Sequence, residues 1–182
     1  MPSPKSDPSC QAGPATLKPK RPSLGGNAPE SLTPYLEERT TLRVRFNEVD
    51  ALQIVWHGHY ANYFEEGRRA FGRRYGVDYT EFLAQRVAVP VVQLHVDYFA
   101  PARLADTLEI RARLLKSEAA KLVFDYELRR EGEERLLAAG RTVQVFTTPA
   151  GELMLSWPTF MLERLTTWEP LWLNPTPDRP SP

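Results

Sequence analysis

The sequence predicts an α+β fold in which a five-stranded antiparallel sheet is wrapped around one long helix. Residues 59–76 carry their apolar side chains at steps of three and four, which is typical of a helix with one buried face. Five other segments alternate apolar and polar side chains, which is typical of half-buried strands. One helix cannot cover both faces of a flat five-stranded sheet, so we expect the sheet to curve around the helix.

The first strand is predicted at residues 41–48 and the long helix at residues 59–76. The strand carries apolar side chains on one face and polar side chains on the other: Leu42, Val44 and Phe46, against Arg43, Arg45 and Asn47. The apolar stripe of the helix consists of Tyr60, Phe64, Gly67, Phe71 and Tyr75. A glycine within a helix costs about 1 kcal/mol relative to alanine, so we expect the helix to approach another backbone closely at Gly67. Gly76 is expected to end the helix.

The residues after the long helix predict a short helix and four further strands. The short helix is expected at 79–86, and the strands, in a meander, at 92–98, 108–114, 122–128 and 134–148. Gly132 supplies the turn before the last strand. Pro158 is expected at the first position of a closing helix over 158–165.

Composition divides the chain into one domain and two tails. Residues 1–39 and 169–182 are rich in proline and polar side chains, so we expect both to be disordered unless one of them docks a partner. The domain then covers residues 40–168, an ordinary size for a single domain.

Charge and cysteine content restrict the partners and the compartment. The formal net charge is zero at pH 7, so we expect neither nucleic acid nor an anionic membrane as a partner. Cys10 is the single cysteine, which excludes an intramolecular disulfide and favours the cytoplasm. No apolar run approaches the roughly 20 residues that span a bilayer, and the N-terminal residues lack the apolar region of a signal peptide.

The segment DALQIVWHGHYANYFEE, residues 50–66, holds the candidate catalytic groups. It connects the first strand to the long helix, whose first N–H groups are unpaired and carry a partial positive charge. Such a helix end suits an oxygen that becomes negative during acyl transfer, and the backbone N–H of His57 is the natural donor. Asp50 lies at the end of the strand, where a carboxylate can act as nucleophile or general base.

Ordinary structural roles compete with this hypothesis. An aspartate ahead of a helix is most often a cap or a turn residue, although Asp50 lies rather far ahead of the helical stripe for an N-cap. His57 and His59 flank a glycine, but no nearby cysteine or carboxylate cluster completes a ligand set, so no metal is expected. His95 lies on the polar face of a predicted strand, where we expect a surface or interface residue.

The stretch FNEVDALQIVWHGHYANYFE, residues 46–65, resembles the signature of the 4-hydroxybenzoyl-CoA thioesterase-like branch of the hot dog fold proteins, which includes acyl-CoA thioesterases. YFAPARLAD at 98–106 and LLAAGRTV at 136–143 match two further motifs in the same order. The resemblance covers residues 40–165, which is nearly the whole predicted domain.

The resemblance implies a hot dog fold, an acyl-CoA substrate, no bound cofactor or metal, and a homodimer or homotetramer with active sites at subunit interfaces. Asp50 matches the catalytic aspartate of the family. His57 matches the residue whose backbone N–H polarises the thioester carbonyl. The residues expected to line the substrate site are Gln53, Trp56, His59 and Tyr60.

Gln53 stands where the family usually has a glycine. Glycine adopts backbone angles that other residues resist, so Gln53 either projects its amide into the site or blocks productive binding. We expect hydrolysis of an acyl-CoA; the alternatives are a hot dog protein that binds acyl thioesters without cleaving them, and a dehydratase or hydratase. Candidate contacts for the coenzyme A phosphates are Arg103, Arg111, Arg113 and Lys121, although charged strand faces are usually only solvated.

Overall fold

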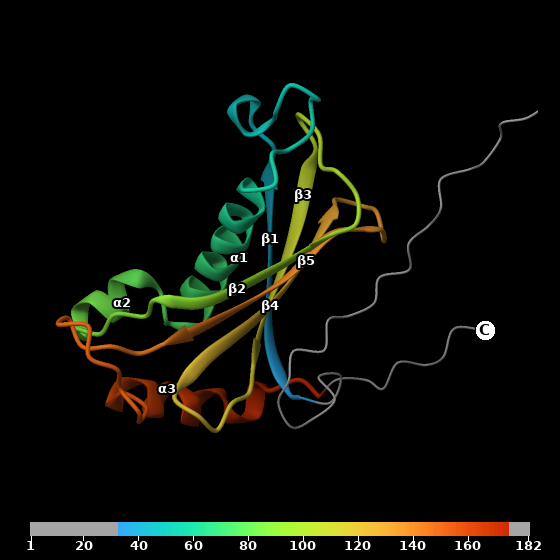
Figure 1. Cartoon of the computed structure of the whole chain (residues 1–182). Coiled ribbons are helices and arrows are strands. Elements are labelled where there is room, and N and C mark those ends of the chain that lie inside the picture. The colour runs from blue at the N-terminus through green and yellow to red at the C-terminus, as the bar shows by residue number, and fades with distance from the viewer. Residues whose placement is uncertain (1–32, 175–182) are drawn as a thin grey trace, which may run out of the picture.

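A computed structural model of the chain describes residues 33–174, so the predicted disorder of residues 1–32 and 175–182 lies outside the described residues. The strands are β1 (Tyr35–Arg43), β2 (Val91–Tyr98), β3 (Thr107–Leu115), β4 (Lys121–Arg130) and β5 (Leu136–Val145). The helices are α1 (His59–Tyr75), α2 (Tyr79–Ala84) and α3 (Thr159–Trp168). Figure 1 shows a strongly twisted sheet that curves around α1, with α3 at one end of the sheet. The predicted α+β fold is confirmed.

The predicted meander is correct for only part of the sheet. The strand order is β1-β3-β4-β5-β2, and every neighbouring pair is antiparallel. β3, β4 and β5 therefore form a meander, whereas β2 pairs with β5 at the edge opposite β1. Alternation along a strand tells which face a side chain takes, but it does not tell which strand lies next to it.

The first strand begins earlier than predicted. β1 ends at Arg43, and residues 46–48 form a 3-10 turn in which Phe46 is 81% exposed. The sequence pattern failed because Glu38 lies opposite the buried Ala112, on the inner face of the sheet, and pairs there with Arg74 of α1 at 2.7 Å. This inward-facing charge interrupts the apolar alternation.

The folded domain also extends beyond both predicted boundaries. Tyr35 opens β1 ahead of residue 40. Tyr35 and Leu173 exchange two backbone hydrogen bonds of 3.0 and 2.8 Å, so the chain past residue 168 packs against the first strand. Pro158 is the N-cap of α3, one position before the predicted one.

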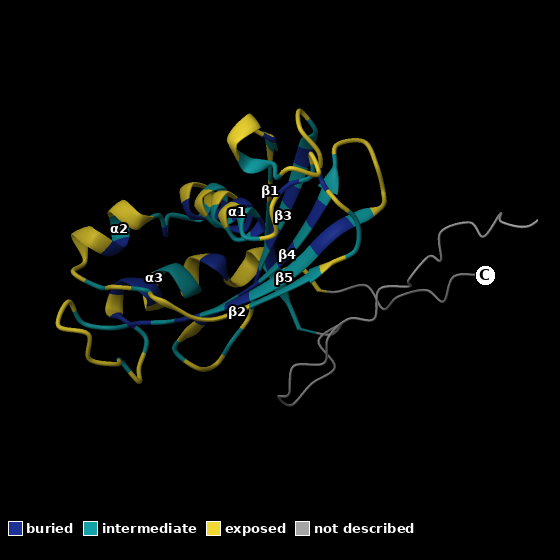
Figure 2. Ribbon diagram, turned by 45° about the horizontal axis from the view of Figure 1, so that its top comes forward, coloured by how far each residue is buried: buried dark blue, intermediate teal, exposed yellow. Residues whose placement is uncertain are grey.

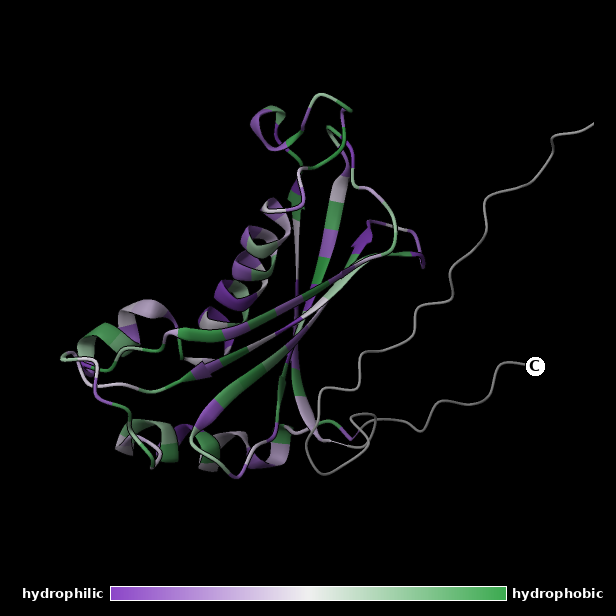
Figure 3. Cartoon of the chain, in the orientation of Figure 1, coloured by the Kyte–Doolittle hydropathy of each residue, from purple (hydrophilic) through white to green (hydrophobic). Residues whose placement is uncertain are grey.

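The apolar stripe of α1 lies against the inner face of the sheet, as predicted. Figure 3 shows the alternation of hydrophobic and hydrophilic residues along β3, and Figure 2 shows that buried residues follow β3, β4 and β5. A Cβ atom at Gly67 would lie 2.7 Å from Cγ2 of Ile110 in β3, so the close approach expected there is to a side chain rather than to a backbone. Gly76, with φ of 72°, ends the helix as predicted. This packing holds the middle of α1 close to β3.

None of the helices within residues 33–174 is both long and apolar enough to cross a membrane.

Candidate active site

The segment from residue 48 to residue 57, here called the active-site loop, forms a narrow antiparallel turn ahead of α1. The N–H of Asp50 donates to the carbonyl of Ile54 at 2.9 Å, and the N–H of Trp56 donates to the carbonyl of Glu48 at 2.9 Å. The N–H of Gln53 closes the turn by donating to the carbonyl of Asp50 at 2.9 Å. The loop therefore presents Asp50 on a backbone that is held by three hydrogen bonds.

The carboxylate of Asp50 has one oxygen bound and one oxygen free. Oδ1 accepts a hydrogen bond from the N–H of Leu52 at 2.8 Å, which is the turn role that an aspartate often has. Oδ2 has no hydrogen-bond partner among residues 33–174, and the residue is half-buried. The turn bond thus orients the carboxylate and leaves its second oxygen available for chemistry.

Gln53 adopts the backbone conformation that glycine would adopt easily. Its φ is 56°, in the left-handed region, which costs roughly 1–2 kcal/mol for a residue with a side chain. Its side chain is exposed. The loop therefore keeps its turn although a glutamine replaces the usual glycine.

The start of α1 offers unpaired backbone donors. The helix begins at His59 with Gly58 as its N-cap. Within residues 33–174, the N–H groups of His57 and Gly58 donate no hydrogen bond. The hydroxyl of Tyr98 donates to the carbonyl of His57 at 2.9 Å and fixes this segment against β2. Free N–H groups at a helix N-terminus can bind an oxyanion.

The side chains of Trp56, His57 and His59 lie together at this helix end. The Trp56 ring lies 4.7 Å from the His57 ring and 5.7 Å from the His59 ring, centre to centre. A Cβ atom at Gly58 would lie 1.9 Å from an atom of the Trp56 ring, so the tryptophan packs directly on the N-cap. With Trp56 half exposed, these rings form an open aromatic surface beside the free N–H groups.

Tyr60 was expected at the substrate site, more for packing than for chemistry, and its side chain is buried in the structure. It is 3% exposed, and its hydroxyl accepts a hydrogen bond from the N–H of Ala102 at 3.1 Å. Ala102 also accepts from the N–H of Val55 at 2.9 Å. Burial raises the pKa of Tyr60, so the phenol stays neutral at physiological pH. Tyr60 therefore anchors the active-site loop to the segment that follows β2.

The sequence analysis missed a second anchor of the loop. The hydroxyl of Tyr63 donates to Oε2 of Glu48 at 2.8 Å, and the N–H of Arg45 donates to the same oxygen at 2.8 Å. Burial and the Glu48 carboxylate raise the pKa of Tyr63, which keeps this donor protonated. Glu48 was visible as the acidic residue of the motif, but nothing in the sequence paired it with Tyr63.

Two of the arginines considered for coenzyme A are already paired. Arg111 and Arg113 form ion pairs with Glu37 and Glu127 of the neighbouring strands. Arg103 is different, because it forms an isolated β-bridge with Ile54 and so lies beside the active-site loop. No three His, Cys, Asp or Glu side chains of the described part of the chain lie close enough together to hold a metal ion.

The curved sheet around α1 is the hot dog fold, and the chain belongs to the thioesterase-like superfamily, whose sequence profile matches residues 44–165. The acyl-CoA thioester hydrolase YbgC of Escherichia coli is 35% identical over 86 residues, which cover 47% of this chain and 64% of YbgC. The match therefore spans less than two thirds of that relative's length.

Solved structures support the fold. The hypothetical protein TT1821 from Thermus thermophilus is 35% identical, with a TM-score of 0.64, and the match covers 71% of this chain and 97% of that one. The DHNA-CoA thioesterase from Staphylococcus aureus is 21% identical, with a TM-score of 0.67, and the match covers 74% of this chain and 92% of that one. At this lower identity the likeness concerns the fold.

Proposed function

We propose that the chain hydrolyses the thioester bond of an acyl-CoA. Asp50 is the nucleophile or the general base, and the N–H groups at the start of α1, with His57 foremost, stabilise the negative oxygen of the tetrahedral intermediate. The observation that carries this proposal is the pair of N–H groups at the start of α1 that donate no hydrogen bond. They come directly after the loop that orients Asp50 and leaves one of its carboxylate oxygens without a partner. The substrate class is supported by the 35% identity to an acyl-CoA thioester hydrolase.

The reaction needs two events at the thioester carbon. An oxygen attacks this carbon, either from Asp50 or from a water molecule that Asp50 deprotonates, and the carbonyl oxygen becomes an oxyanion. The C–S bond then breaks, and coenzyme A leaves as a thiolate that takes up a proton. If Asp50 itself attacks, water hydrolyses the resulting anhydride and restores the carboxylate.

We also propose that the active unit is at least a homodimer joined along β2. β2 is an edge strand, and Figure 2 shows exposed residues along most of it. Its large apolar side chains are about half exposed: Val91, Val92, Leu94 and Tyr98. An exposed apolar edge is a template for pairing with another strand. Antiparallel pairing of two β2 strands would place the Val91 end of one protomer beside the Tyr98 end of its partner, and so beside the partner's helix end.

Light scattering tests this assembly. We expect a mass of at least two chains of 20.8 kDa at micromolar concentration. A monomer that turns over substrate would contradict the shared site. The cytoplasmic location expected from the single cysteine stays a prediction.

Release of free thiol from a panel of acyl-CoA substrates tests the activity. We expect thiol release that is proportional to the protein concentration and saturates with substrate. The exposed, strained Gln53 favours the alternative of a non-catalytic binder. Such a binder would show heat of acyl-CoA binding in calorimetry without release of thiol. A dehydratase or hydratase would instead change the acyl group and leave the thioester intact.

A further inference from the structure

The two N–H groups at the start of α1, those of His57 and Gly58, belong to two different peptide units. In a planar trans peptide unit the N–H group and the carbonyl group point in opposite directions. The carbonyl opposite the N–H of His57 is that of Trp56, and the carbonyl opposite the N–H of Gly58 is that of His57. Whatever holds each carbonyl therefore sets the direction of the N–H group on the other side of the unit.

The two carbonyls are held by different parts of the chain. The Trp56 carbonyl accepts from the N–H of His59 at 2.9 Å, so the turn itself holds the first peptide unit. The His57 carbonyl accepts from the N–H of Tyr60 at 3.4 Å, which exceeds about 3.2 Å, the upper end of the usual range. The hydroxyl of Tyr98 donates to the same carbonyl at 2.9 Å. Tyr98 thus makes the shorter bond to the second peptide unit.

The side chain of Tyr98 is itself held in position. Tyr98 is the last residue of β2, and its backbone pairs with that of Ala138 in β5. Its ring packs edge-on against the buried ring of Tyr60, with the ring centres 5.0 Å apart and the planes at 89°. Burial raises the pKa of the Tyr98 phenol, so the hydroxyl stays protonated at physiological pH and remains a donor. The sheet therefore presents a fixed donor to the start of α1.

We propose that Tyr98 is a positioning residue of the thioesterase reaction, and that it directs the N–H of Gly58 toward the oxyanion as a second donor beside the N–H of His57. Hydrogen bonds in series polarise one another. When the Gly58 N–H donates to the developing oxyanion, the His57 carbonyl oxygen becomes more negative and accepts more strongly from Tyr98. Tyr98 then stabilises the transition state more than the bound substrate. The inference rests on the proposed thioesterase function.

The kcat of Tyr98→Phe tests this role, because the substitution deletes the hydroxyl and keeps the ring against Tyr60. Removal of a whole oxyanion donor lowers kcat by about 10²–10³-fold. Tyr98→Phe loosens a donor without removing it, so we expect a loss of about tenfold in kcat and little change in KM. The matched control is Tyr75→Phe at the other end of α1, since the Tyr75 hydroxyl also donates to a backbone carbonyl, that of Glu37 at 3.0 Å. It should leave kcat unchanged.

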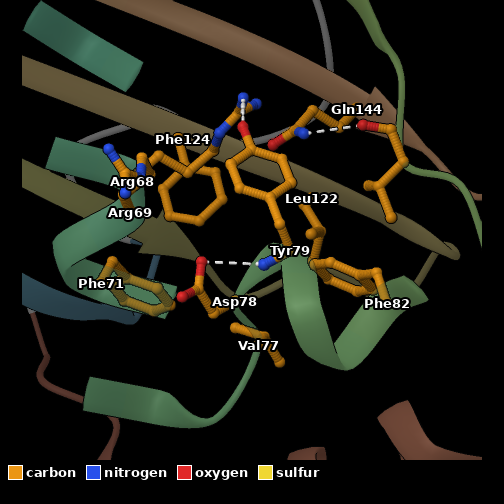
Figure 4. A pocket seen from close by; sticks show the side chains of 11 residues that line it. Arg68, Arg69, Phe71, Val77, Asp78, Tyr79, Phe82, Leu122, Phe124 and Gln144 are labelled. Carbon is orange, nitrogen blue, oxygen red and sulfur yellow. Dashed lines mark hydrogen bonds between the residues drawn. The ribbon is translucent and has the colours of Figure 1, made fainter. Parts of the chain in front are cut away.

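The substitution does not touch the pocket between α1, α2 and the inner face of the sheet. Figure 4 shows this pocket, which is lined by Arg68, Phe82 and Gln144 among others, and Tyr98 is not one of the lining residues. A loss of kcat in Tyr98→Phe would therefore originate at the start of α1 and not in that pocket.

NMR spectroscopy tests the same geometry without requiring hydrolysis. The ¹³C resonance of the His57 carbonyl and the amide resonances of Gly58 should shift in Tyr98→Phe and stay unchanged in Tyr75→Phe. The probe for the two donors is a ketone analogue of acetyl-CoA, in which a methylene group replaces the sulfur and the carbonyl carbon is ¹³C. Its carbonyl resonance should move downfield on binding to the wild type, because the N–H groups polarise the C=O bond. The movement should be smaller in Tyr98→Phe.

An unchanged kcat in Tyr98→Phe would overturn the proposal, and so would a rise in KM alone, which indicates a role in binding. An equal loss of kcat in Tyr75→Phe would show a general loosening of α1 instead. The proposal also fails if the ketone resonance does not move in the wild type, or moves equally in Tyr98→Phe. Circular dichroism verifies the fold of both variants. If the wild type releases no thiol from any acyl-CoA, the thioesterase function fails, and the ketone experiment still decides the role of Tyr98.

Discussion

Gly67→Ala tests whether α1 lies as close to the sheet as the structure shows. The added Cβ would lie 2.7 Å from Cγ2 of Ile110 and 3.5 Å from the Cβ of Ala112. Carbon atoms pack best at about 3.5–4.0 Å, and Ile110 is fully buried. Accommodating the methyl group therefore requires a movement of the helix or the strand.

Two opposing contributions decide the size of the effect. Overpacking a core costs about 1–3 kcal/mol, whereas replacing glycine within a helix stabilises it by about 1 kcal/mol. We expect a net loss of up to about 2 kcal/mol in the free energy of unfolding, measured by urea denaturation at 25 °C. Ala70→Gly, in the same helix, is the control for propensity alone and should cost about 1 kcal/mol.

A double-mutant cycle identifies the contact. Ile110→Ala removes the atom that the new methyl group would meet and should cost about 2–5 kcal/mol alone. Combined with Gly67→Ala, it should cost less than the sum of the two single changes by about 1–3 kcal/mol. Strictly additive effects would refute the close packing of α1 against β3.

Three further predictions concern the loop, the helix end and acid stability. Gln53→Gly should stabilise the fold by up to about 1 kcal/mol in urea unfolding, because it relieves a left-handed φ. The control is Gln85→Gly, which should destabilise the fold because Gln85 has an ordinary φ of −82°. His57→Ala should lower kcat less than tenfold, whereas His57→Pro, which deletes the N–H, should lower it by about 10²–10³-fold. Circular dichroism verifies the fold of both variants. A severe loss of kcat in His57→Ala would show that the imidazole itself is catalytic. Burial raises the pKa of Glu37, but the hydrogen bonds from Arg113 and Arg39, with the charges of Arg113 and Arg111, outweigh it and hold the pKa below its usual value of 4.5. The stability that these arginines give to ionised Glu37 is present above pH 4.5 and is lost as the pH falls through the lower pKa of the folded state. The Tm of the wild type should therefore fall more steeply below pH 4.5 than the Tm of Glu37→Gln. Parallel curves of Tm against pH would contradict the assignment.

The sequence predicted most of the elements because their patterns are local. The stripe from Tyr60 to Tyr75 has an uninterrupted helical spacing, and β3 and β4 alternate apolar and polar side chains along most of their length. β1 was misplaced because Glu38 faces inward and is compensated by Arg74, a partner that lies on another element. The neighbour of β2 could not be predicted either, since strand order depends on contacts distant in sequence.

At the candidate site, too, the local features could be predicted and the contacts distant in sequence could not. Asp50 and His57 belong to one short segment, so the sequence was sufficient to nominate both residues. Their anchors, such as the hydroxyl of Tyr98, come from elements far along the chain. Gln144 carried a signal that was overlooked, because it occupies an inward-facing position of β5, as the buried Thr142 does two residues earlier. A polar residue at such a position indicates a buried partner or a ligand.

The kcat of Asp50→Asn on the best acyl-CoA substrate tests the central claim most directly. The substitution keeps the oxygen that can accept from Leu52 and removes the charge needed for attack or for deprotonation of water. We predict a loss of about 10²-fold or more in kcat with an unchanged circular dichroism spectrum. Glu163→Gln, which neutralises an exposed carboxylate on α3, should leave kcat unchanged. An Asp50→Asn protein that keeps most of the wild-type kcat would contradict the account.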